Sequence, residues 1–129
     1  MIGEKVEHFQ GKGTDLSRLQ THIEEYLKSE SFTVQTSAPS THGTVIQAKK
    51  GGFLRAAIDA NHAMTVMISG SSDDFTVRIG IGKWLQNLAV AAVETLLVSE
   101  LFLVIDVAEN VWTIEIEDKL VKDLKSFVG

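Results

Sequence analysis

The chain has 129 residues, of which 44% are hydrophobic and 22% are charged, and its formal net charge at pH 7 is −5. This size and composition predict one globular domain over residues 1–129 and exclude a largely disordered chain. The chain contains no cysteine, which excludes disulfides and thiolate metal sites, and its acidic balance makes nucleic acid an unlikely partner.

Residues 1–12 contain no apolar stretch of the kind that a secretory signal requires. Together with the lack of cysteine, which suits a reducing compartment, this predicts a cytoplasmic protein. The sequence also contains no internal repeat and no low-complexity segment, so no domain boundary is expected inside it.

The N-terminal part of the chain predicts a short strand followed by a helix. The strand is expected over Val6–Phe9, and two glycines after it end it. Apolar residues then recur at the spacing of one helix face, namely Leu16, Leu19, Ile23, Tyr26 and Leu27. With Thr14 as the N-cap, this pattern predicts a helix over Asp15–Ser29.

Four further strands are expected in the middle of the chain. Apolar and polar residues alternate over Phe32–Ser37, Thr44–Lys49, Met64–Ser69 and Phe75–Ile81, with a hairpin turn at Gly70–Asp74. Such alternation predicts an antiparallel sheet with one buried and one solvated face. The residues expected on the solvated face are Thr33, Gln35, Ser37, Thr65, Met67, Ser69, Thr76 and Arg78. The pattern of residues 53–58 does not decide their secondary structure, and one helical turn is an alternative.

Two helices are expected after the sheet. Residues 83–107 are mostly apolar and rich in Ala and Leu, which predicts a long helix. Asn110 is a candidate cap for a last helix that carries Ile116, Leu120, Leu124 and Phe127, although residues 111–117 also alternate as a strand would. The element order β-α-β-β-β-β-α-α predicts a two-layer α+β sandwich, in which an antiparallel sheet of about five strands packs on helices.

This order resembles one repeat of the TATA-binding-protein-like fold and, less closely, the helix-grip fold of lipid carriers. The segments Val45–Arg55 and Gly80–Leu85 also resemble a small prokaryotic domain of unknown function, in which a basic Gly-Gly turn and a Gly-Lys-Trp step precede an apolar helix. The resemblance implies a fold and no activity. DNA binding is not implied, because the expected solvated sheet face has no aromatic residue and one cation.

Basic residues lie at two turns that flank the central strands. Lys49, Lys50 and Arg55 surround one glycine turn, and Lys83 follows Gly80 and Gly82 at the other. If the turns are neighbours, these four cations form one anion-binding edge. The complete phosphate-loop motif is not present, so the pattern is weak evidence for a phosphate ligand.

The apolar segment 83–107 has residues on more than one helix face that need cover. Leu88–Ile105 is near bilayer length, but Glu94 and Glu100 make a spanning helix unfavourable. Three alternatives remain for what buries this apolar surface: the last helix, a second copy of the chain, or lipid. The residues expected in self-association are Trp84, Leu88, Leu96 and Leu103.

Catalytic and metal-binding patterns are weak. His22 and Glu25 share a helix face, but no further ligand pair accompanies them, so a solvated face is expected and no metal or cofactor is predicted. No nucleophile-elbow or zinc-protease motif occurs, so an enzyme is not expected. The sequence predicts a non-catalytic binding or interaction module that forms a homodimer through residues 83–107. The alternative is a peripheral membrane or lipid-binding domain that uses the basic turns and the apolar helix.

Overall fold

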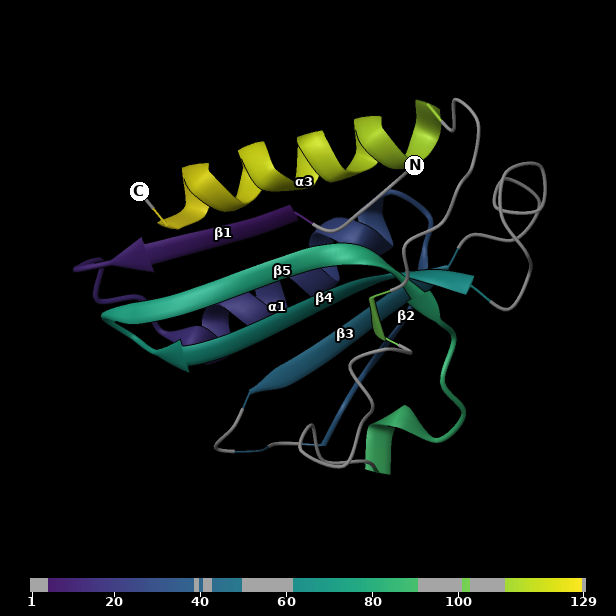
Figure 1. Cartoon of the computed structure of the whole chain (residues 1–129), viewed down its shortest axis with the longest axis horizontal. Helices are drawn as coiled ribbons and strands as arrows, with labels where there is room; N and C mark the ends of the chain where they lie inside the picture. The colour runs from purple at the N-terminus through teal and green to yellow at the C-terminus, as the bar shows by residue number, and fades with distance from the viewer. Residues whose placement is uncertain are drawn as a thin grey trace.

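A computed structural model describes residues 5–38, 40, 43–49, 62–90, 101–102 and 111–128. The elements are β1 (Lys5–Gln10), α1 (Leu16–Ser29), β2 (Thr33–Thr36), β3 (Thr44–Lys49), β4 (His62–Ser71), β5 (Asp74–Lys83), the 3-10 helix η2 (Leu88–Val90) and α3 (Val111–Val128). The strands form one open antiparallel sheet in the order β1-β5-β4-β3-β2 (Figure 1). The predicted α+β class with a five-stranded antiparallel sheet is therefore confirmed.

The strands lie where the alternation of apolar and polar residues predicts them. β4 and β5 form a long hairpin that pairs from His62 with Lys83 to Ser71 with Asp74. β1 joins the outer side of β5, with Phe9 opposite Phe75 and their rings stacked at 5.0 Å between centroids. The predicted ambiguous segment 53–58 lies outside the described residues.

Helix α1 begins one residue later than predicted, because Asp15 is its N-cap in place of Thr14. The Asp15 backbone is extended, and its carboxylate accepts from the backbone N–H groups of Ser17 (2.9 Å) and Arg18 (3.3 Å). A carboxylate at this position satisfies the free amides of the first turn and suits the helix dipole. The helix buries Leu19, Ile23 and Leu27 against the sheet.

The main core lies between the sheet and the two helices. Figure 1 shows α1 behind the sheet and α3 running beside β1. α3 contributes the fully buried Leu120 and Leu124, and it is helical from Val111, so the alternative of a strand over residues 111–117 is wrong. Ion pairs tie α3 to β1, Lys5 with Asp118 at 2.7 Å and Lys125 with Glu7 at 3.2 Å.

The second face of the sheet differs from the prediction of a solvated surface. Thr65 and Gln47 are both 0% exposed, because the chain that follows β5 crosses this face. Leu88 and Leu101 pack there on Val45 and form a second, smaller core. Further along this face, the guanidinium of Arg78 lies 4.4 Å from the ring centroid of Phe102.

The predicted helix over 83–107 is wrong at its beginning. Lys83 is the last residue of β5, and only the short η2 follows before residue 91. Asn87 has a φ of 60°, a left-handed conformation that interrupts a right-handed helix. Residues 91–100 and 103–107 lie outside the described residues. Within the described ranges, no helix is both long and apolar enough to cross a membrane.

Candidate functional site

The predicted anion-binding residues are partly described. Lys49 ends β3, and its ammonium lies 4.3 Å from the ring centroid of Trp84. Lys83 ends β5 and is exposed. Strand alternation places Lys49 on the second face, in step with the buried Val45, and Lys83 on the helix face, in step with Ile81. Lys50 and Arg55 lie outside the described residues, so the edge of four cations stays a prediction.

Of the four residues predicted for self-association, the structure describes two, Trp84 and Leu88. Trp84 is half-buried beside Lys49, and Leu88 is fully buried against Val45 and Leu101 of the same chain. Leu88 therefore covers the sheet of its own chain in this conformation. Leu96 and Leu103 lie outside the described residues.

The sequence predicts that His22 lies on a solvated helix face, but the structure places it elsewhere. Its Nε2 is 2.6 Å from a carboxylate oxygen of Asp123 on α3, and its ring stacks on Phe127 at 4.3 Å between centroids. This side chain therefore fastens the two helices to each other. Among the described residues, no three His, Asp or Glu side chains are grouped as a metal site would need.

A buried amide, Gln47, organises the second face, and the sequence analysis did not single it out. Its Nε2 donates to the carbonyl of Lys83 (2.5 Å) and to the hydroxyl of Thr65 (3.2 Å). Its Oε1 accepts from the backbone N–H of Leu85 and from the side chain of Gln35, both at 2.9 Å. All of its hydrogen-bonding groups are used inside the protein, so Gln47 positions the crossing chain and has none left for a ligand.

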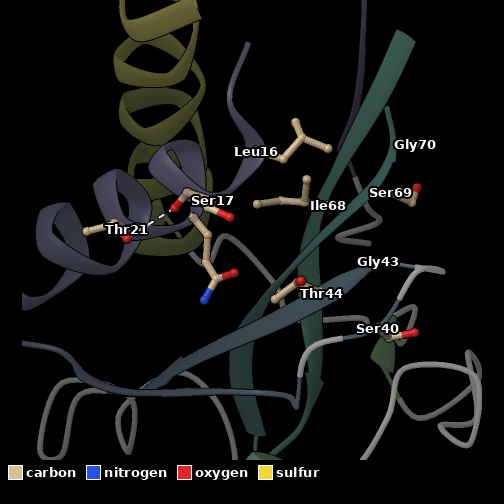
Figure 2. Close-up of a pocket in the computed structure, with 10 residues that line it drawn as sticks. Leu16, Ser17, Thr21, Ser40, Gly43, Thr44, Ile68, Ser69 and Gly70 are labelled. Carbon is tan, nitrogen blue, oxygen red and sulfur yellow. Dashed lines mark hydrogen bonds between the residues drawn. The ribbon is translucent and has the colours of Figure 1, made fainter. Parts of the chain in front are cut away.

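The strongest candidate for a binding site is a pocket of about 440 Å³ on the helix side of the sheet. The first two turns of α1 form one wall, and the neighbouring ends of β3 and β4 form the other (Figure 2). The lining residues are Leu16, Ser17, Gln20, Thr21, Ser40, Gly43, Thr44, Ile68, Ser69 and Gly70. This volume falls in the range of small-molecule sites.

The pocket exists because polar and small residues replace core residues at this corner. On α1, the lining residues lie beside the stripe of Leu19 and Ile23 that packs on the sheet. On the sheet, Thr44 pairs with Ile68 at the end of the β3–β4 ladder. These short side chains do not fill the space between helix and strands, whereas longer apolar ones do so elsewhere.

Gly43 shapes the rim of this pocket. Its φ is 133°, and a Cβ at this position would lie 2.5 Å from the carbonyl oxygen of Ile68. Only glycine lets the chain enter β3 so close to β4. The glycine therefore fixes the position of Thr44 in the pocket wall.

The pocket retains hydrogen-bonding capacity. Thr21 donates to the carbonyl of Ser17 at 3.1 Å, which leaves its oxygen free to accept (Figure 2). The Gln20 amide makes one long bond of 3.4 Å to Glu24. The hydroxyls of Ser17 and Thr44 make no hydrogen bond to another described residue. The wall can therefore both donate to a ligand and accept from it.

The described residues of the pocket wall carry no formal charge, since they are hydroxyl, amide, aliphatic and glycine residues. Two nearby amides of the first helical turn, those of Ser17 and Arg18, are also engaged, because the Asp15 carboxylate already accepts from them. The residue types are ordinary in a sequence, and they come from segments far apart in the chain. Sequence periodicity carries no signal that would group them.

Comparison of the chain with protein-family models, with curated proteins and with solved structures gives no match. The function of the chain is therefore inferred from its own geometry.

Proposed function

We propose that this protein is a non-catalytic binding module that holds a small ligand in the pocket between α1 and the ends of β3 and β4. The observation that carries the proposal is a hollow of about 440 Å³ walled by a helix and two strands of the sheet. Side chains on helices and strands are held in place better than those on loops, which favours specific binding. Free hydroxyls at Ser17 and Thr44 supply the polar contacts.

Binding is a better interpretation than catalysis because of the chemistry of the wall. A serine or threonine nucleophile needs an adjacent general base, and the described residues that line the pocket contain no His, Lys, Asp or Glu. Proton transfer needs a group that titrates near the working pH. Hydroxyl and amide groups bind a ligand by hydrogen bonds, which need neither a general base nor a titrating group.

The test is ligand screening by NMR on the intact chain. A panel of sugars, amino acids, nucleosides, phosphate esters and short fatty acids is added at millimolar concentration. Binding is mapped on the backbone amides of Gly43 and Gly70. We expect one class to shift these amides, and Thr21→Trp to abolish the shift by filling the pocket. Ser126→Trp, at an exposed helix position outside the pocket, is the matched control and leaves binding intact. The proposal fails if no class shifts these amides, or if both variants bind alike.

Self-association through residues 83–107 is a second proposal. The observation in its favour is Val90, whose large apolar side chain is 82% exposed two residues after the buried Leu88. Light scattering tests it, since a dimer has twice the mass of the chain. The alternative, a peripheral membrane domain, predicts instead that liposomes retain the protein in flotation.

For the fold, we propose kinship with TATA-binding-protein-like repeats, supported by a strand and helix followed by four strands and a C-terminal helix. DNA binding does not come with it. Proteins of that type use an open sheet face for the minor groove, whereas here Leu88 and Leu101 pack on Val45 of β3 on that face.

A further inference from the structure

We infer that the ligand of this pocket is an uncharged polyhydroxylated molecule, a saccharide or a polyol. The inference rests on the proposed function, and it names the ligand class. It follows from the kind of groups that face the pocket and from the ligand classes that these groups would disfavour.

The polar groups of the wall match hydroxyls. Five of the lining residues offer neutral polar side chains: Ser17, Gln20, Thr21, Ser40 and Thr44. Ser69 follows Ile68 in β4, so its side chain points to the other face of the sheet. A hydroxyl donates one hydrogen bond and accepts others, as a sugar hydroxyl does, so the two satisfy each other in either direction. The aliphatic side chain of Leu16, which is half-buried, offers an apolar surface for the C–H groups of the same ligand, beside Ile68 of the main core (Figure 2).

Anions are disfavoured at this site. The pocket lies at the first turns of α1, where free backbone amides would attract an anion. Here the Asp15 carboxylate accepts from the amides of Ser17 and Arg18, so those donors are engaged. The described lining residues also contain no Lys or Arg that would pair with a phosphate or carboxylate ligand.

Peptides and fatty acids are also disfavoured. A peptide that binds by strand addition needs an unpaired strand edge, and β3 and β4 each have a neighbour on both sides. Beyond the end of the β2–β3 ladder, Ser37 pairs with the backbone of Val45 through its N–H and its hydroxyl. An aliphatic chain would bury the hydroxyls of Ser17 and Thr44 without partners, which costs free energy.

The experiment compares four probes on the intact chain: glucose, glucose 6-phosphate, diglycine and cyclohexanol. Glucose is expected to shift the amides of Gly43 and Gly70, and its phosphate to bind no more tightly. Thr44→Val and Ser17→Ala each remove one hydroxyl, and each is expected to weaken glucose binding about fivefold. The matched controls, Thr33→Val and Ser126→Ala, remove exposed hydroxyls outside the pocket and leave the affinity unchanged.

The outcomes separate this inference from the proposed function. If glucose binds at the pocket and the two pocket variants weaken it, the ligand class is supported. If another probe shifts the pocket amides and glucose does not, the ligand class is wrong while the pocket stands. If no probe of this set or of the screening panel shifts them, both fail.

Discussion

The fully buried Gln47 makes a quantitative prediction about stability. Gln47→Leu keeps the size of the side chain and removes its hydrogen bonds to the carbonyl of Lys83 and the N–H of Leu85. Each part-buried backbone group left without a partner costs about 1–2 kcal/mol, whereas Thr65 retains its bond to the carbonyl of Ala63. The free energy of unfolding should therefore fall by about 2–4 kcal/mol, a large part of the stability of a small domain.

Chemical denaturation measures this loss, and Gln10→Leu at the exposed end of β1 is the matched control. The loss should be accompanied by faster hydrogen exchange at the Leu85 amide, because Gln47 holds the chain that crosses the second face. Gln35→Leu should cost less, about 1 kcal/mol, since Gln35 is only half-buried. If Gln47→Leu and Gln10→Leu differ by less than about 0.5 kcal/mol, the surface-mutation range, Gln47 does not hold the crossing chain.

Three further predictions concern the rim, a titrating group and the assembly. Gly43→Ala should lower the free energy of unfolding by about 1–3 kcal/mol in urea denaturation, because its Cβ would collide with the Ile68 carbonyl; an unchanged midpoint would contradict this. Burial, followed by the carboxylates of Glu30 and Asp123, raises the pKa of Tyr26 above its ordinary value of about 10. The unfolded chain therefore ionises first, so stability should fall as the pH rises above about 10, and Tyr26→Phe should remove that part of the fall. The only tyrosine of the chain makes the titration visible by absorbance, and an ordinary value would refute the effect of burial. Light scattering should give the mass of a dimer, and a monomer would overturn self-association.

The strands and the two main helices could be predicted because their signals are local. Strand Thr44–Lys49 has the bounds that its alternation predicts, and the helix Leu16–Ser29 follows from its apolar stripe. Where two adjacent residues can both cap a helix, local sequence does not choose between them. Thr14 is buried and its backbone N–H bonds to the carbonyl of Ser72, which leaves Asp15 as the N-cap.

Residues 83–90 show where local signals fail. Their apolar composition predicts a helix, but an amide 36 residues away binds the carbonyl of Lys83. On the face that was expected to be solvated, Leu88 and Leu101 pack on Val45 and form a second core. The apolar composition predicts that these residues are buried, but it does not predict which surface buries them.

The sequence by itself determined the five strands, the helices α1 and α3 and the α+β class, because periodicity and turn residues act over a few neighbours. Only the tertiary structure decided the strand order, the cover of the second face and the pocket. Each of these depends on residues far apart in the chain, such as Ser17 and Thr44 on opposite walls of the pocket. A pocket forms where packed elements leave space between short side chains, and periodicity along the chain does not predict that space.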